Sequence, residues 1–446
     1  MSVRISIIGG CGAMGRWIIN YLKGKGDFEI IIADPDEIEG TRLVKTFGIK
    51  YEYDNKEAVR DSDIVIVSVP VEVTPNVIAE VAPHMKEGSL LIDIASIKTE
   101  AVSSMLKHAP SSVELLSIHP MFGPRVKDVK GQVIAIIPVR PGKWFEKVKA
   151  FLEKEDADVV VTTCEEHDKI MSIVQGLTHF TSIVFAGVIR EMNIDLKQSR
   201  RFSTPIYNAF LPIVYRVVCQ NPELYAQLQV RNPHVLEVQE KFISQAVKLN
   251  EETRNKNVKE MVKQIVSSCK HFMTTESSTT LLSMSDRMVS TLQRERNILE
   301  SLIGRKICLE NVQTGKIHIG VLKKVSANAI EIEESKKKVV SLSLFNVTLL
   351  DEKATMEVRR SMFGESSLDF SVMLPLDFDT EICREIVEKF LTEAFKIEVL
   401  ETYVGEQIPA GFRSITLRIH YPKDENSKNI YMKTENLLKR IGGKLR

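Results

Sequence analysis

Two short segments carry side chains that could perform proton chemistry. The segment SLLIDIAS (89–96) ends in Ser96, and VELLSIHP (113–120) ends in His119 and a proline. Both are mainly apolar runs, as expected of strands buried on both faces of a sheet. Histidine titrates near neutral pH, which suits a general base. A histidine at a strand end is otherwise a satisfied polar residue, so its role depends on its neighbours.

A glycine-rich turn near the N-terminus predicts a dinucleotide site. GCGAMG (10–15) directly follows the strand-like VRISIIGG (3–10) and precedes a helix-like segment. We expect Gly10 to permit the tight turn, Gly12 to let the backbone approach a pyrophosphate, and Gly15 to pack the helix on the strand. The free N–H groups at the helix start would supply the anion site. The residues assigned to the cofactor are Gly10, Gly12, Ala13, Met14, Gly15, Asp34 and Pro70.

Asp34 ends a second expected strand, FEIIIADPD (28–36), and lies about 20 residues beyond the turn. A carboxylate there accepts a hydrogen bond from the ribose 2′-OH and repels a 2′-phosphate. No arginine occurs between 33 and 41, which favours NAD over NADP. The alternative is a solvated acid in a turn.

Strand and helix patterns alternate through the first 160 residues and predict an α/β Rossmann domain with a doubly wound parallel sheet. Further strands are expected at DIVIVSVP (63–70) and GQVIAIIP (131–138). Ligands of such sheets bind beyond the carboxyl ends of the strands. Pro70, Ser96 and His119 should therefore face one crevice, next to the nicotinamide.

The motifs together resemble the prephenate dehydrogenase (TyrA-type) family of tyrosine biosynthesis. IDIASIKTE and HPMFGP behind the glycine turn carry the resemblance, which MSIVQGLTHFTS (171–182) and NPELYAQLQ (221–229) extend to about residue 250. It implies oxidative decarboxylation of prephenate to 4-hydroxyphenylpyruvate, with hydride transfer to NAD and no metal. It implies His119 as the catalytic base and Ser96 as its partner on the 4-hydroxyl. Lys98 is open to a structural or a functional interpretation.

From about residue 165 the apolar period changes to near 3.6, which predicts an all-α domain. Gln175 and His179, four residues apart, should share one helix face. They serve either interhelix hydrogen bonding or, as the resemblance implies, substrate contact. Arg216 lies in the apolar stretch LPIVYRVVCQ, where a buried guanidinium needs a partner. The resemblance favours the prephenate ring carboxylate over a glutamate, although Asn208 stands where some relatives have arginine.

The family core does not account for the residues after about 300. Residues 304–350 alternate with period 2, with turn signals at Gln313-Thr-Gly and Ser326-Ala-Asn, and predict a small β-barrel-like domain. Residues 367–446 have a ferredoxin-like element order, and GEQIPAG with SITLRIHY resembles the anticodon-binding domain of the phenylalanyl-tRNA synthetase β chain. An aromatic amino-acid effector is the preferred ligand, and RNA binding is disfavoured. The RNA candidates are Lys433, Lys439, Arg440, Lys444 and Arg446.

Composition sets outer limits on function. The 446 residues carry a net charge of +1, which gives no global attraction to nucleic acid or anionic membranes. Six scattered cysteines without a CxxC pair predict neither a zinc site nor a redox dithiol. We expect a cytoplasmic protein without a signal peptide or membrane span, and a homodimer formed through the apolar helices. The expected domains are 1–164, 165–300, 301–355 and 356–446.

Two alternatives stay open at this point. Arogenate dehydrogenase acts on a substrate with an amino rather than a keto side chain, and the sequence does not separate the two substrates. A non-catalytic NAD-binding regulatory or RNA-associated protein would need the fold but not the chemistry. The joint presence of Ser96, His119, His179 and Arg216 disfavours it.

Overall fold

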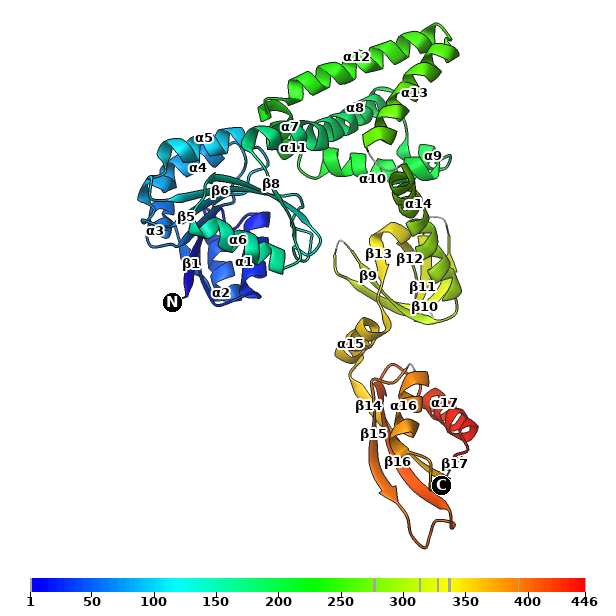
Figure 1. Cartoon of the computed structure of the whole chain (residues 1–446). Helices are drawn as coiled ribbons and strands as arrows, with labels where there is room; N and C mark the ends of the chain where they lie inside the picture. Colours follow the sequence, from blue (N-terminus) through cyan, green and yellow to red (C-terminus); the bar gives the residue numbers. More distant parts are fainter. Residues whose placement is uncertain are drawn as a thin grey trace. The chain divides into compact units, whose positions relative to one another are not determined.

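The computed structural model describes residues 2–275, 278–312, 314–326, 329–335, 338–391 and 393–445 (Figure 1). The predicted turn residues Gln313 and Ala327-Asn328, and the RNA candidate Arg446, lie outside this description. The chain divides into two compact units, Met1–Ser285 and Asp286–Arg446. The finer domain boundaries expected at 164, 300 and 355 stay predictions.

An eight-stranded sheet forms the centre of the first unit, in the order β3-β2-β1-β4-β5-β6-β7-β8. The pairs from β3 to β6 are parallel, which confirms the predicted Rossmann architecture. The strands are β1 (Val3–Ile8), β2 (Phe28–Ala33), β3 (Lys50–Glu52), β4 (Ile64–Val67), β5 (Leu90–Asp93), β6 (Glu114–Pro120), β7 (Val133–Arg140) and β8 (Asp158–Val161).

One pair departs from the predicted parallel sheet. β7 runs antiparallel to β6, with His119 opposite Ala135, so the expectation of parallel strands is wrong here. A parallel neighbour requires a crossover connection, usually a helix. Residues 121–132 form only turns between the two strands, so the chain returns as an antiparallel neighbour. The carboxyl end of β6, which carries His119, therefore lies beside the amino end of β7.

Helices cover both faces of this sheet, and two apolar cores result. One core joins the sheet to α1, α2 and α6 through Ile19, Leu43 and Leu152. The other joins it to α3, α4 and α5, with Ile78 and Met105 fully buried. The helices are α1 (Ala13–Lys23), α2 (Glu37–Phe47), α3 (Asn55–Val59), α4 (Thr74–Val81), α5 (Thr99–His108) and α6 (Lys143–Lys154).

The rest of the first unit is helical, as predicted. The helices are α7 (Cys164–Met171), α8 (Thr178–Glu191), α9 (Leu196–Arg200), α10 (Pro205–Cys219), α11 (Pro222–Arg231), α12 (Val235–Arg254), α13 (Val258–Thr275) and α14 (Ser278–Ser301), the last of which continues into the second unit. A π-helical turn, Ser172–Leu177, joins α7 to α8. The resulting 28-residue run Cys164–Glu191 is long and apolar enough to span a membrane by length and composition alone, which the sequence analysis did not expect.

The second unit contains two antiparallel sheets. The first has the order β12-β11-β10-β9-β13 and packs on Leu299 of α14, and the second has the order β15-β16-β14-β17 and packs on α16 and α17. The elements are β9 (Lys306–Asn311), β10 (Ile317–Val325), β11 (Ala329–Ser335), β12 (Lys338–Ser343), β13 (Val347–Leu349), α15 (Glu352–Phe363), β14 (Glu365–Pro375), α16 (Thr380–Phe390), β15 (Lys396–Tyr403), β16 (Phe412–Pro422), α17 (Ser427–Arg440) and β17 (Lys444–Leu445). The chain thus carries an additional C-terminal β-sheet region.

Candidate active site

The glycine turn between β1 and α1 is tight because side chains are excluded at several positions. Gly9, not Gly10, adopts the left-handed conformation, with φ of +82°, and a Cβ there would lie 2.5 Å from the Ser68 carbonyl oxygen. A Cβ at Gly10 would meet Ile32, and one at Gly15 would lie 2.5 Å from the Gly9 carbonyl oxygen. The predicted close packing at Gly15 is therefore present. The turn itself depends on Gly9, which the sequence analysis did not single out.

The start of α1 presents unpaired backbone donors. Gly12 is the N-cap of α1 and provides no side-chain hydrogen bond, and Gly12 and Ala13 are exposed. Because the first N–H groups of a helix have no intrahelical partner, those of Ala13, Met14 and Gly15 are available to an anion. The Pro70 carbonyl, by contrast, accepts the backbone N–H groups of Val73 and Thr74 at the start of α4. Pro70 is exposed, and its contact with a cofactor stays a prediction.

Asp34 fixes the glycine turn against the end of β2. Its Oδ2 accepts the backbone N–H of Cys11 at 3.0 Å, and its Oδ1 accepts that of Asp36 at 3.0 Å. Burial, followed by the charges of Asp34, Asp36 and Glu39, raises the pKa of the Cys11 thiol to about 12. The turn therefore combines an exposed helix start with a carboxylate at the end of the next strand, as the sequence predicted.

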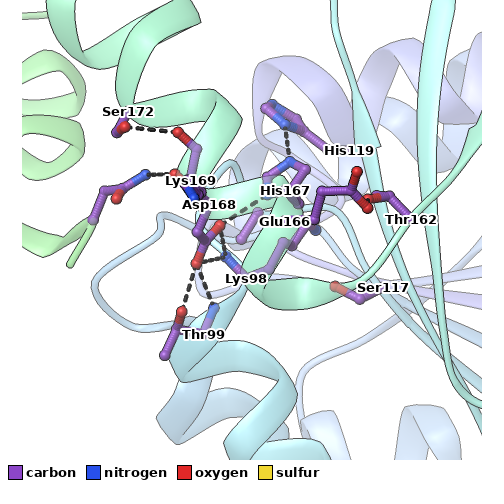
Figure 2. Close-up of polar contacts among 12 residues, drawn as sticks. Lys98, Thr99, Ser117, His119, Thr162, Glu166, His167, Asp168, Lys169 and Ser172 are labelled. Carbon is purple, nitrogen blue, oxygen red and sulfur yellow. Dashed lines mark hydrogen bonds and ion pairs between the residues drawn. The ribbon is translucent and has the colours of Figure 1, made fainter. Parts of the chain in front are cut away.

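His119 ends β6 as a buried side chain, only 3% exposed. Its Nδ1 lies 2.9 Å from Nε2 of His167, and the two rings meet edge to face at 5.1 Å (Figure 2). Burial is the main cause that holds the pKa of His119 well below its usual range, and the positive charge of Lys98 adds to it. A neutral imidazole at the carboxyl end of a central strand is what a base in this crevice requires.

Lys98 is fully buried and forms an ion pair with Asp93, also fully buried, at 3.0 Å. Its Nζ also donates to the Ile118 carbonyl oxygen at 2.7 Å, directly before His119. The Ser117 hydroxyl donates to the same aspartate. Burial lowers the pKa of Lys98, and Asp93 opposes that shift. Of the two interpretations left open for Lys98, these contacts favour that of a structural neighbour that charges the surroundings of His119.

His167 and Asp168, consecutive residues of α7, are the main site residues missed from the sequence. His167 Nδ1 lies 2.8 Å from Asp168 Oδ1, and both side chains are buried. Asp168 accepts further hydrogen bonds from Thr99 and from the backbone of Lys98, at the start of α5 (Figure 2). The available signal was a His-Asp pair near the start of a helix that follows a strand. Only the apolar residues of this helix entered the prediction of an all-α domain.

Ser96 and His179 approach the same region from different elements. Ser96 is half-buried in the loop that follows β5, between the buried residues Ala95 and Ile97. These two pack with Val71 and Leu228, and Tyr225 of α11 lies against this small core. The ring of His179 meets Tyr225 edge to face at 4.6 Å. The loop that holds Ser96 and the helix that holds His179 are therefore linked through α11.

The half-buried side chain of His179 has an unpaired ring nitrogen and a lowered pKa among the described residues. Its Nδ1 is buried and has no hydrogen-bond partner within the described part of the chain, and burial lowers its pKa. Gln175 lies in the π-helical turn, where the i→i+5 bonding changes the helical spacing. The regular α-helical spacing therefore does not extend through Gln175, and the shared face of Gln175 and His179 stays a prediction. Such π-turns occur frequently at functional sites.

Arg216 differs from its predicted environment. It is exposed on α10, and none of the described residues forms an ion pair with it. The expectation of a buried guanidinium was wrong because α10 buries only Val214 and Val217 within the described chain. Its apolar residues include Ile213 and Tyr215, which are 40% and 63% exposed. Nothing in the described contacts brings Arg216 to His119.

Sequence comparison places the chain among known proteins. The family model described as "Prephenate dehydrogenase, nucleotide-binding domain" matches residues 18–161, and "Prephenate dehydrogenase, dimerization domain" matches residues 163–267. A protein of Methanocaldococcus jannaschii, "Probable arogenate/prephenate dehydrogenase", is 38% identical over 449 residues, which cover 100% of this chain and 99% of that protein. The chain belongs to the prephenate dehydrogenase family. It is thus an oxidoreductase with a nucleotide-binding Rossmann domain and a helical dimerisation domain.

Two further comparisons concern the cofactor and the fold. "Probable prephenate dehydrogenase [NADP(+)]" of Schizosaccharomyces pombe is 26% identical over 249 residues, which cover 55% of this chain and 57% of that protein. A crystal structure of prephenate dehydrogenase from A. aeolicus, in complex with hydroxyphenyl propionate and NAD+, has a TM-score of 0.50 at 18% identity. The match covers 62% of this chain and 99% of that one. At this identity the likeness is one of fold alone.

Proposed function

We propose that the chain is an NAD-dependent prephenate dehydrogenase that oxidatively decarboxylates prephenate to 4-hydroxyphenylpyruvate. The observation that carries the proposal is the neutral, buried imidazole of His119 at the carboxyl end of β6, in a chain that matches an arogenate/prephenate dehydrogenase over its whole length. The reaction removes a hydride from C4, a proton from the 4-hydroxyl and CO2 from the ring. Only the proton requires a base.

His119 accepts the proton of the 4-hydroxyl as C4 is oxidised, and Ser96 holds the same oxygen by a hydrogen bond. Ser96 is suited to this because it lies half-buried after β5, the parallel neighbour of β6. Loss of CO2 then makes the ring aromatic and leaves a phenolate oxygen. The phenolate regains its proton from His119, so the histidine ends each cycle neutral.

NAD, when bound, takes the hydride. The chain fits this cofactor because a Cβ at Gly10 would collide with Ile32, a Cβ at Gly15 would collide with the backbone of the turn, and α1 begins with free backbone donors. The backbone N–H groups of Ala13, Met14 and Gly15 would hold the pyrophosphate beside Gly12, and Asp34 would accept from the adenosine ribose. The Asp34 carboxylate supports NAD rather than NADP, because it would repel a 2′-phosphate. The relative that is named for NADP makes this a point for direct assay.

The substrate carboxylates require cationic or donor groups. We assign the ring carboxylate to Arg216, with His179 and Gln175 near the substrate. Exposure of Arg216 and of apolar residues on α10 is compatible with a homodimer that covers this helix, as the dimerisation domain of the family indicates. The long apolar run Cys164–Glu191 then serves as an interface helix.

An assay of cofactor reduction tests the proposed function. Purified protein is mixed with prephenate or arogenate and with NAD or NADP, with and without tyrosine, and the reduced cofactor is followed. We expect the highest kcat/KM with prephenate and NAD. A clear preference for arogenate would replace the substrate assignment, and no turnover with either substrate would overturn the proposal. Arogenate dehydrogenase is the second candidate because the relative of full length is named for both substrates.

For the second unit we propose two small domains. The order β14-α16-β15-β16-α17-β17, with the sheet order β15-β16-β14-β17, supports a ferredoxin-like domain at 356–446. The five strands at 301–355 support a barrel-like domain, although β12 and β13 do not pair within the described residues. An aromatic amino acid is the proposed effector, and the tyrosine arm of the assay tests it.

A further inference from the structure

The hydrogen bonds around Asp168 fix the direction of each donor. Its Oδ2 accepts the Thr99 N–H at 2.9 Å and the Thr99 hydroxyl at 2.6 Å, and its Oδ1 accepts the Lys98 N–H at 3.0 Å. Backbone N–H groups can only donate. Burial alone would raise the pKa of Asp168, but the hydrogen bonds from His167, Thr99 and the backbone outweigh it and lower the pKa. Asp168 is therefore ionised and acts only as an acceptor.

The acceptor role of Asp168 determines where His167 carries its hydrogen. His167 Nδ1 lies 2.8 Å from Asp168 Oδ1, so this nitrogen must be the one that bears hydrogen. In a neutral His167 ring, Nε2 then has a lone pair. That Nε2 is 2.9 Å from His119 Nδ1, which must donate to it. His119 is left with its own lone pair on Nε2, and this is the nitrogen that can accept a proton.

We propose that His167 and Asp168 are positioning residues that hold His119 as the Nδ1–H tautomer, with Nε2 free to act as the base. The proposal rests on the proposed function for its chemical role, but the tautomer itself does not depend on the substrate. Two lone pairs cannot bond each other, so the chain of donors from His119 to Asp168 permits a single direction while both rings are neutral. A proton on both nitrogens of His167 would reverse it and leave His119 without a basic nitrogen toward the substrate.

The pair also accounts for the charge that appears during the proton transfer. The substrate O–H bond breaks and an N–H bond forms at His119 Nε2, so the ring becomes an imidazolium while Nδ1 continues to donate to His167. Asp168 is the carboxylate that faces this ring through His167, and Lys98, paired with Asp93, is the cation beside it. Asp168 favours the imidazolium and Lys98 opposes it. The base is thus held neutral at rest and compensated when it is protonated.

The position of the pair is fixed from three directions. Asp168 caps the start of α5, where Lys98 is the N-cap residue and offers no side-chain cap of its own. The backbone carbonyl of Asp168 accepts the Asn232 side chain at 2.8 Å, and Asn232 is buried. Thr163 caps α7 by accepting the backbone N–H of Glu166. His167 therefore has little freedom to turn away from His119.

The experiment measures the tautomer directly. Protein labelled with ¹⁵N-histidine is examined by long-range ¹H–¹⁵N correlation NMR, and the His119 signals are assigned by their loss in His119→Asn. We expect His119 to show a protonated Nδ1 and an unprotonated Nε2 near neutral pH in the wild type. A proton on Nε2 instead would overturn the proposal, whatever the activity.

The His167→Phe variant keeps a ring in place but removes the acceptor. We expect mixed His119 tautomers, with kcat lowered by ~10- to 100-fold, the range seen when an outer partner that orients a histidine is removed, and KM little changed. His318→Phe is the matched control, since His318 is also buried and pairs with a carboxylate, Glu334, in the other unit. An unchanged tautomer and kcat in His167→Phe would overturn the proposal. If that variant does not fold, the wild-type spectrum decides alone.

Failure of this proposal and failure of the proposed function give different results. A wild type that shows the Nδ1–H tautomer but oxidises neither prephenate nor arogenate keeps the positioning residues and loses the reaction. A wild type that oxidises prephenate with hydrogen on His119 Nε2 keeps the reaction and loses the positioning residues.

Discussion

Each unit contains a buried cluster of acidic and basic side chains. The pKa values of the basic side chains are lowered in the first cluster, and the pKa of the arginine is raised in the second. Around His119 the cations are pushed toward neutrality, since burial lowers the pKa of both His119 and Lys98. In the second unit Arg359, 6% exposed, lies between Asp424 and Glu425. Burial there would lower the pKa of Arg359, but the two carboxylates outweigh it and raise the pKa. The first cluster has a nitrogen able to accept a proton, whereas the second joins α15 and the start of β9 to the chain before α17.

The two clusters differ in that one can take up a proton and the other holds secondary-structure elements together by ion pairs. Each charge of the second cluster is matched, and Lys306 adds a further ion pair to Asp424 at 2.5 Å. Such a cluster positions elements but has no group that changes its protonation near neutral pH. In the His119 cluster, none of the described residues forms a hydrogen bond with Nε2 of His119. An unused, shifted group in a crevice is a physical sign of a functional site.

The largest expected effect comes from His119→Asn. Loss of the general base should lower kcat by ~10² to 10⁴-fold, while NAD affinity stays nearly the same because the glycine turn is untouched. Steady-state kinetics and NAD titration measure the two quantities. His318→Asn, at the buried histidine of the second unit, should leave both unchanged. Turnover like that of the wild type in His119→Asn would remove this histidine from the mechanism.

Removing the basic side chain at the centre of each cluster should lower stability in both units but change the chemistry in only one. Lys98→Met leaves the fully buried Asp93 without its cation, and Arg359→Met leaves the partly exposed Glu425 without one while Asp424 keeps Lys306. Loss of one partner of a buried ion pair typically costs ~3–5 kcal/mol of unfolding free energy, so we expect that cost for Lys98→Met and a smaller one for Arg359→Met. Only Lys98→Met should also shift the pH profile, because it removes the charge that helps to lower the pKa of His119. Denaturant unfolding and kcat/KM against pH distinguish the two variants. An acid limb that moves equally in both would contradict the comparison.

Arg216 belongs to neither cluster and tests the assigned substrate contact. Arg216→Ala should raise KM for prephenate by ~10- to 100-fold, since a hydrogen bond to a charged group contributes ~1.5–3 kcal/mol. Arg216→Lys should fall between, because lysine keeps the charge but not the bidentate fork. Arg190→Ala, at another exposed arginine of the helical region, is the control. Unchanged KM in Arg216→Ala would show that the ring carboxylate is held elsewhere.

The smallest expected effect concerns pH. The pKa of His119 in the fold lies well below 6.5, so kcat/KM should stay nearly flat from pH 7.5 to pH 6.5 and fall only at lower pH. The same shift makes stability greatest above the unfolded pKa of about 6.5, with a loss as pH falls toward the lower folded value. Initial rates and unfolding midpoints across pH 4.5–8 measure both. A kinetic pKa at or above 6.5 would show that the imidazole is not held neutral by burial.

The sequence pattern predicted those elements whose formation depends on neighbouring residues along the chain. The strand, glycine turn and helix at 3–23, and the strand that ends at Asp34, follow from residue types within short windows. The antiparallel β7 did not, because strand direction depends on the connection and not on the strand's own residues. Gly9 was missed because an additional glycine beside the expected pattern gives no spacing signal.

The candidate site divides in the same way. The positions of His119 near the end of β6 and of Ser96 shortly after β5 could be predicted because strand ends are visible in the sequence, while their roles stay predictions. His167 and Asp168 could not, because their partners lie 48 and about 70 residues away and meet them only through packing. The exposure of Arg216 could not be predicted either, since an apolar helix has the same pattern in a core and at an uncovered surface.

Because His167 and Asp168 lie on α7, the groups proposed to bind the nucleotide and the groups proposed to orient the base come from different parts of the first unit. The Rossmann strands alone would supply the glycine turn, the acid and the imidazole, so a fragment that ends before α7 could still capture a nucleotide. In such a fragment the His119 imidazole could adopt either tautomer, and the Asp168 carboxylate would no longer act on it through His167. On the proposed mechanism, a helix outside the nucleotide fold sets the tautomer of the base, so a recombination that separates the two would leave a nucleotide binder whose turnover is lowered.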